Sequence, residues 1–160
     1  MKIPETMFEV GGNVGWFAKA ASEYGVKEID AVDLNPLSVE IANTKMGIAN
    51  YAGVAMDFAE YPPHRQYDLV VALDYLEHTY TPWADLQKLT SMVTPGGVLL
   101  IKTFLDDKDT NREMLAPPTH AIHWTTPVLR GAIERTGLVI RHWADGYKGF
   151  MPEIIAQKPQ

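Results

Sequence analysis

The sequence predicts an α/β fold: a doubly wound, seven-stranded, mostly parallel sheet with an antiparallel last strand and helices on both faces. Apolar stretches of strand length alternate with stretches of helical periodicity along most of the 160 residues. Glycine and proline mark the turns between them. Repeated strand–helix–strand units favour a parallel sheet. The last two apolar stretches have no helix between them, so they are expected to pair as a hairpin.

The first half of the chain is expected to contain three strands and two helices. A glycine-rich turn at 11–15 separates the first strand from the first helix, and Gly25 is placed to end that helix. Asn35 and Pro36 open the second helix as its cap and first helical residue. The predicted strands are 7–10, 26–33 and 51–56, and the predicted helices are 17–24 and 36–46.

The second half is expected to contain four strands and two helices. The Thr-Pro pairs at 81–82 and 126–127 are typical of helix starts. A turn at 94–97 contains two glycines, and the polar, proline-containing stretch at 106–119 is predicted to be a loop. The predicted strands are 67–73, 98–103, 138–143 and 153–157, and the predicted helices are 82–93 and 126–136.

Composition excludes several kinds of site and partner. There is no cysteine, so disulfides, thiolate metal clusters and cysteine nucleophiles are excluded. The formal net charge is −6 and the basic residues are scattered, which disfavours nucleic acid as a partner and favours a neutral or cationic ligand. No apolar stretch approaches the roughly 18 residues of a membrane helix, and the N-terminus does not resemble a signal peptide. We expect a single cytoplasmic domain over residues 1–160.

Carboxylates recur where successive strands of the predicted sheet end. Glu9, Asp33, Asp57 and Asp74 each stand at or just after the end of a strand. In a doubly wound sheet these ends share one crevice. Four acids there suit a ligand with hydroxyls, an amino group and a positive charge, although any one of them alone is as well explained as a helix cap. The dinucleotide fingerprint Gly-x-Gly-x-x-Gly does not fit the turn at 11–15 in either register.

These features resemble the class I S-adenosylmethionine-dependent methyltransferases of the small-molecule branch. Residues 9–15 (EVGGNVG) resemble the family's acid-x-Gly-x-Gly-x-Gly motif, with Asn13 in place of the middle glycine. Asparagine tolerates the left-handed backbone conformation of such a turn. Further matches follow in the family's order at Asp33, 56–58, 67–78 (ending in Leu-Glu-His), 95–99 and 120–137.

The resemblance implies S-adenosylmethionine as cofactor and transfer of its methyl group to a small-molecule acceptor. It implies that Asp33 holds the ribose hydroxyls and that Asp57 meets the adenine amino group. The implied cofactor contacts are Glu9, Gly11, Asn13, Gly15, Asp33, Leu34, Asp57, Phe58, Asp74 and Tyr75. The alternative is a catalytically inactive, methyltransferase-like binding or partner subunit. A nicotinamide-dependent oxidoreductase is disfavoured by the glycine spacing.

A general base is needed only if the acceptor is protonated at working pH. The candidates are His78 and His123, with Tyr75 less favoured. No metal is expected, because His120 and His123 are only a two-histidine pair, which a packing role in a loop explains better.

The cover of the crevice is a separate expectation. Residues 1–6 are too few for a covering helix, so the N-terminal cap of the family is expected to be missing. The segment 106–119 is then expected to act as a lid over the cofactor. A second copy of the chain, in a homodimer, is the alternative cover.

Overall fold

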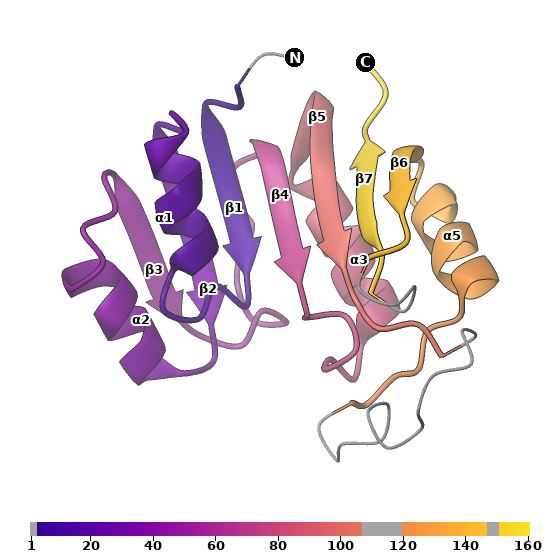
Figure 1. Ribbon diagram of the computed structural model, residues 1–160, viewed down its shortest axis with the longest axis horizontal. Helices are drawn as coiled ribbons and strands as arrows, with labels where there is room; N and C mark the ends of the chain where they lie inside the picture. Colours follow the sequence, from indigo (N-terminus) through magenta and orange to yellow (C-terminus); the bar gives the residue numbers. More distant parts are fainter. Residues whose placement is uncertain (1–2, 107–119, 147–150) are drawn as a thin grey trace.

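The computed structural model describes residues 3–106, 120–146 and 151–160, and it confirms the predicted fold class. Seven strands form one sheet in the order β3-β2-β1-β4-β5-β7-β6 (Figure 1). Strand β7 is antiparallel to both of its neighbours, β5 and β6, so the predicted hairpin and its antiparallel last strand are confirmed. The strands are β1 (Thr6–Val10), β2 (Glu28–Asp33), β3 (Tyr51–Ala55), β4 (Tyr67–Leu73), β5 (Val93–Lys102), β6 (Val139–Ala144) and β7 (Glu153–Gln157).

Helices cover both faces of this sheet. They are α1 (Trp16–Glu23), α2 (Pro36–Thr44), α3 (Pro82–Ser91) and α5 (Thr126–Arg135). Helices α1 and α3 lie on opposite faces (Figure 1). The Asn35 side chain caps α2 by accepting hydrogen bonds from the backbone N–H groups of Leu37 and Ser38, as the Asn-Pro pair predicts. Among the described helices, none has an apolar stretch long enough to cross a membrane.

The core is divided between the two faces because successive residues of a strand face opposite ways. In β1, Met7 packs with Ala18 of α1, whereas Phe8 and Val10 belong to a larger cluster on the other face. That larger cluster includes Leu86 of α3 and the fully buried apolar residues of α5. The small cluster and the large cluster cover opposite faces of the sheet, and the strands packed between them end at the site.

Strand β5 is longer than the sequence predicts. The turn expected at 94–97 is instead part of β5, which begins at Val93, and α3 ends at Ser91 rather than at residue 93. Val93 fits the apolar stripe of the helix in sequence, but in the fold it pairs with Tyr67 of β4. Gly96, at a φ of +80°, donates its N–H to the Lys158 carbonyl, so pairing with the chain after β7 extends the strand. Residues 107–119 of the predicted lid lie outside the described part of the chain.

The order of the strands fixes where a ligand can bind. The chain moves outward from β1 to β2 and β3, and then returns to place β4 on the other side of β1. Such a reversal leaves a crevice at the carboxyl ends of the strands next to it. The turn after β1 and the loop after β4 therefore face each other across this crevice.

Candidate functional site

The turn after β1 adopts a conformation that requires glycine or asparagine. Gly11, Asn13 and Gly15 have φ values of +70°, +47° and +85°. A Cβ at Gly15 would lie 2.8 Å from Ile48 Cδ1, so a larger residue does not fit there without a shift. Asn13 fits because asparagine is tolerated at positive φ, and its Oδ1 accepts a hydrogen bond of 2.7 Å from the Val14 N–H. The replacement of the family's middle glycine by Asn13 thus preserves the turn.

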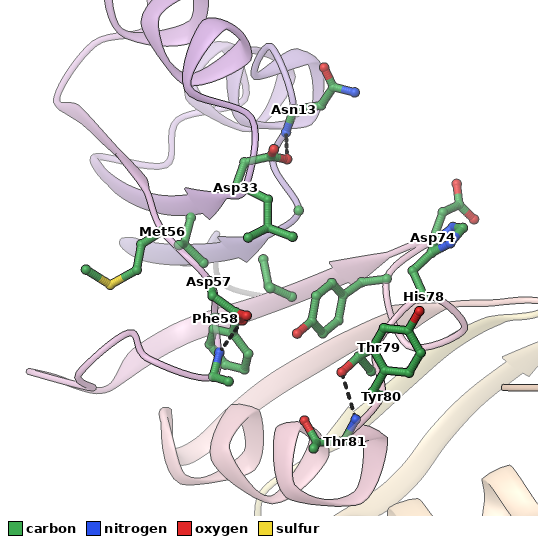
Figure 2. Close-up of a pocket in the computed structure, with 16 residues that line it drawn as sticks. Asn13, Asp33, Met56, Asp57, Phe58, Asp74, His78, Thr79, Tyr80 and Thr81 are labelled. Atoms are coloured by element: carbon green, nitrogen blue, oxygen red, sulfur yellow. Dashed lines mark hydrogen bonds between the residues drawn. The ribbon is translucent and has the colours of Figure 1, made fainter. Parts of the chain in front are cut away.

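Asp33 joins this turn to the end of β2. Its Oδ2 accepts a hydrogen bond of 2.9 Å from the Asn13 N–H (Figure 2), and its Oδ1 accepts one of 2.8 Å from the Asn35 N–H. A carboxylate oxygen can accept more than one hydrogen bond. Asp33 therefore fixes two loops and still has acceptor capacity for a ligand.

A cavity of about 540 Å³ lies between the ends of β1, β2, β3 and β4. This size is within the range of sites for small molecules and cofactors. The residues that line it include the predicted positions Gly11, Asn13, Asp33, Leu34, Asp57, Phe58, Asp74, Tyr75 and His78. Three predicted site residues, Glu9, Gly15 and His123, are not among those that line it.

Asp57 and Asp74 line the cavity from opposite sides of the sheet's reversal point. Asp57 Oδ1 accepts a hydrogen bond of 2.9 Å from the Ala59 N–H, which holds the turn after β3 (Figure 2). Asp74 follows β4 with a φ of +50°, unusual for a residue other than glycine. Its Oδ2 lies 3.4 Å from Lys102 Nζ, so this carboxylate is paired with a cation.

Glu9 lies beneath the turn rather than in the cavity wall. Its side chain is buried, and an added Cβ at Gly12 would lie 3.5 Å from its Oε2. Burial, and then the nearby Asp33 carboxylate, raise the pKa of Glu9 to about 8, although the Ala18 N–H opposes this. Among the described residues, Glu9 Oε2 has no hydrogen-bond partner. Glu9 is therefore mostly protonated at neutral pH and supports the turn from below.

The other end of the cavity is built on the loop between β4 and α3. The hydroxyl of Tyr75 donates a hydrogen bond of 2.9 Å to Asp85 Oδ2, and the Thr79 hydroxyl donates to the same oxygen. Burial and the Asp85 carboxylate raise the pKa of Tyr75. Tyr75 therefore stays a neutral phenol and does not act as a base at neutral pH.

Three residues of this loop line the cavity although the sequence did not identify them as site residues: Thr79, Tyr80 and Thr81 (Figure 2). They come directly after the Leu-Glu-His segment at 76–78, and their position there is the signal that could have identified them. Thr79 Oγ1 accepts a hydrogen bond of 3.1 Å from the Thr81 N–H, which closes the loop onto the start of α3.

The two candidate bases have different surroundings. His78 lines the cavity on the same loop as Tyr75. His123 does not line the cavity. Its Nδ1 lies 3.5 Å from Oδ2 of Asp106, which belongs to the segment that follows β5. Of the two histidines, the structure therefore brings only His78 together with the predicted cofactor residues.

Comparison with known proteins is consistent with this geometry. Residues 3–142 match the model of a protein family described as a methyltransferase domain. The chain is 29% identical over 104 residues to malonyl-[acyl-carrier protein] O-methyltransferase of Anoxybacillus flavithermus, which covers 64% of this chain and 40% of that protein. It is 32% identical over 111 residues to ribosomal protein L11 methyltransferase of Citrifermentans bemidjiense, covering 68% of this chain and 35% of that protein.

A solved structure confirms the fold. The S-adenosylmethionine-dependent methyltransferase from Mesorhizobium loti superposes with a TM-score of 0.83, covering 96% of this chain and 90% of that one at 15% sequence identity. At this identity the likeness concerns the fold alone. The chain spans less than half the length of the two curated relatives named above.

Proposed function

The chain belongs to the methyltransferase domain family, and from this premise we propose that it moves a methyl group from S-adenosylmethionine to a small-molecule acceptor. The observation that carries the proposal is the pair of carboxylates, Asp33 and Asp57, that line one cavity at the ends of neighbouring parallel strands. The cofactor offers hydroxyl and amine donors, and carboxylates accept such hydrogen bonds strongly.

The residues at this end of the cavity fit the cofactor. Asp33 would accept hydrogen bonds from the ribose hydroxyls, and Asp57 would accept one from the adenine amine. Gly11 has no side chain, and the Tyr75 ring lies only 3.7 Å from where its Cβ would be, so the turn and the ring approach each other closely. When bound, S-adenosylmethionine supplies an activated methyl group whose transfer needs orientation and exclusion of water rather than covalent help from the protein.

The loop after β4 is the proposed acceptor side. His78 is the histidine that lines the cavity there, and it would take the proton of an acceptor hydroxyl or amine. Tyr75 and Thr79 are held by Asp85, so they present fixed surfaces rather than mobile ones. The formal net charge of −6 favours a neutral or cationic acceptor over an anionic one.

Calorimetry with three ligands tests the cofactor assignment. The protein should bind S-adenosylmethionine and S-adenosylhomocysteine and should not bind NADH, because the turn after β1 lacks the dinucleotide spacing. Binding of NADH alone would overturn the proposal. A screen of acceptors with methyl-labelled cofactor then separates an active enzyme from an inactive binding subunit, since only the enzyme transfers the label.

Three finer properties belong to the same proposal. The first is a cytoplasmic location. A small molecule rather than nucleic acid as acceptor is supported by the scattered lysines and arginines. A homodimer would let a second copy cover the cavity, and sedimentation of the protein with S-adenosylhomocysteine tests it.

A further inference from the structure

A buried carboxylate lies just outside the cavity with part of its bonding capacity unused. The Glu77 side chain, in the middle of the Leu-Glu-His segment at 76–78, is fully buried. Its Oε2 accepts a hydrogen bond of 2.7 Å from the hydroxyl of Thr103, the residue that follows β5. Its Oε1 has no hydrogen-bond partner among the described residues. Leaving a buried carboxylate oxygen without a partner is costly, and Glu77, unlike Glu9, has two metal-ligating side chains close enough to share a bound group with it among the described residues.

Two histidines lie beside this carboxylate. The backbone N–H groups of Ala121 and Ile122 both donate to the Glu77 carbonyl, at 2.8 and 3.1 Å, and so hold the neighbouring His120 against Glu77. The rings of His78 and His120 have centroids 4.9 Å apart. One ligand atom each from Glu77, His78 and His120 lies within 4.8 Å of the other two. Residues far apart in sequence are thus held together by the backbone.

We propose that Glu77, His78 and His120 bind a divalent transition-metal ion at the acceptor end of the cavity. Two imidazole nitrogens and one carboxylate are a common ligand set for such ions and leave coordination positions open. Imidazole favours Zn²⁺, Fe²⁺ or Co²⁺ over Mg²⁺ and Ca²⁺, which prefer oxygen ligands. The Thr103 hydroxyl would orient the carboxylate, as groups behind metal ligands usually do.

The ion would lie at the acceptor end of the cavity, where it could activate the acceptor. This step rests on the proposed function. His78 lines the cavity and is exposed, so an acceptor oxygen can reach the open positions. With the ion in place His78 acts as a ligand instead of as the base, and a coordinated hydroxyl loses its proton to solvent more readily, because the ion lowers its pKa. The oxygen then forms a bond to the methyl carbon as the carbon–sulfur bond breaks, and that electron pair stays on sulfur. The acceptor class inferred is therefore one with a hydroxyl able to bind a metal.

Titration with Co²⁺, followed by its visible absorption, tests the site without cofactor or acceptor. The wild-type chain should bind one Co²⁺. His120→Ala should weaken binding at least roughly tenfold, since it removes one of three ligands. His142→Ala, which changes an exposed histidine on β6, is the matched control and should bind as the wild type does. Glu77→Gln, compared after circular dichroism has shown it folded, should behave like His120→Ala.

Two results would overturn the site. One is the absence of Co²⁺ absorption in the wild type with Co²⁺ in large excess. The other is a loss of affinity in His142→Ala equal to that in His120→Ala, which would mean surface binding. Because this titration contains no S-adenosylmethionine, its failure leaves the cofactor calorimetry untouched. A failure of that calorimetry would likewise leave a metal site in place.

Discussion

The two ends of the cavity are built in different ways. The carboxylate end, formed by the turn after β1 and by Asp33 and Asp57, is held by hydrogen bonds from backbone N–H groups to side chains close to the strand ends. The histidine end depends on contacts between Glu77, Thr103 and His120, which the chain brings together from three separate segments. Backbone-anchored ends of this kind leave short motifs in a sequence. Ends assembled by packing leave only scattered residues.

The largest effect is expected at the histidine end and should appear in turnover alone. His78→Ala should lower the rate by about 10²–10⁴ if the acceptor is a hydroxyl, because a positioned base or metal ligand is lost. Affinity for S-adenosylhomocysteine should change little, since Asp33 and Asp57 remain. Steady-state kinetics and calorimetry on the same variant measure both.

His123→Ala is the comparison for that variant. It changes a histidine that does not line the cavity, so it should lose far less activity. Equal losses in the two variants would mean that the segment carrying His123 closes over the reacting groups. Full activity in both would show that methyl transfer here needs neither histidine.

The second effect is expected at the carboxylate end and should appear in binding. Asp33→Ala should weaken binding of S-adenosylhomocysteine at least roughly tenfold, because charge-assisted hydrogen bonds contribute about 1.5–3 kcal/mol each. The variant also removes the bonds from Asn13 and Asn35, so circular dichroism must first show that it folds. Unchanged affinity in a folded variant would contradict the role assigned to Asp33.

The residues that form the carboxylate end could be predicted from the sequence for a physical reason. A turn that needs positive φ at Gly11 and Gly15 restricts the residues that can stand there, and the strand before it fixes where the turn lies. Asp33 was predicted at the end of β2 because strand ends of a parallel sheet meet in one crevice. Glu9 stood in the same motif, but only the structure shows that α1 covers it, because burial depends on packing between elements.

The histidine end could not be predicted to the same extent. The sequence suggested a possible pairing of His120 with His123 by spacing, whereas the fold holds His120 against Glu77 through the hydrogen bonds of Ala121 and Ile122. Such contacts have no periodicity and no fixed separation along the chain. The same holds for Val93, whose spacing fits α3 but whose pairing with Tyr67 places it in β5.

A smaller loss of affinity is expected for Asp57, the second carboxylate at the same end of the cavity as Asp33. Asp57→Ala should weaken S-adenosylhomocysteine binding by less than Asp33→Ala, because it removes one contact to a neutral amine. Part of the Asp57 carboxylate is already used by the Ala59 N–H, so some of the loss will appear as lower stability. Calorimetry of the two variants side by side measures the order, and a larger loss of affinity for Asp57→Ala would exchange their roles.

The smallest effect on ligand binding is expected from changing Glu9, which supports the carboxylate end of the cavity without lining the cavity. The pKa of Glu9 is raised from 4.5 to about 8 in the folded protein, so the folded state holds its proton more tightly than the unfolded state. The contribution of Glu9 to the free energy of unfolding is therefore fully present below pH 4.5. As the pH rises from there towards about 8, the free energy of unfolding falls by up to about 1.4 kcal/mol per pH unit.

Glu9→Gln tests this link between burial and stability. Glutamine keeps the shape of the neutral acid but cannot ionise, so the variant should lose less stability than the wild type as pH rises through this window. Its affinity for S-adenosylhomocysteine near neutral pH should stay close to that of the wild type. Thermal unfolding measured across the window gives the slope. Equal slopes for the two proteins would mean that Glu9 is ionised in the folded state, and the turn would then rest on a buried charge rather than on a neutral acid.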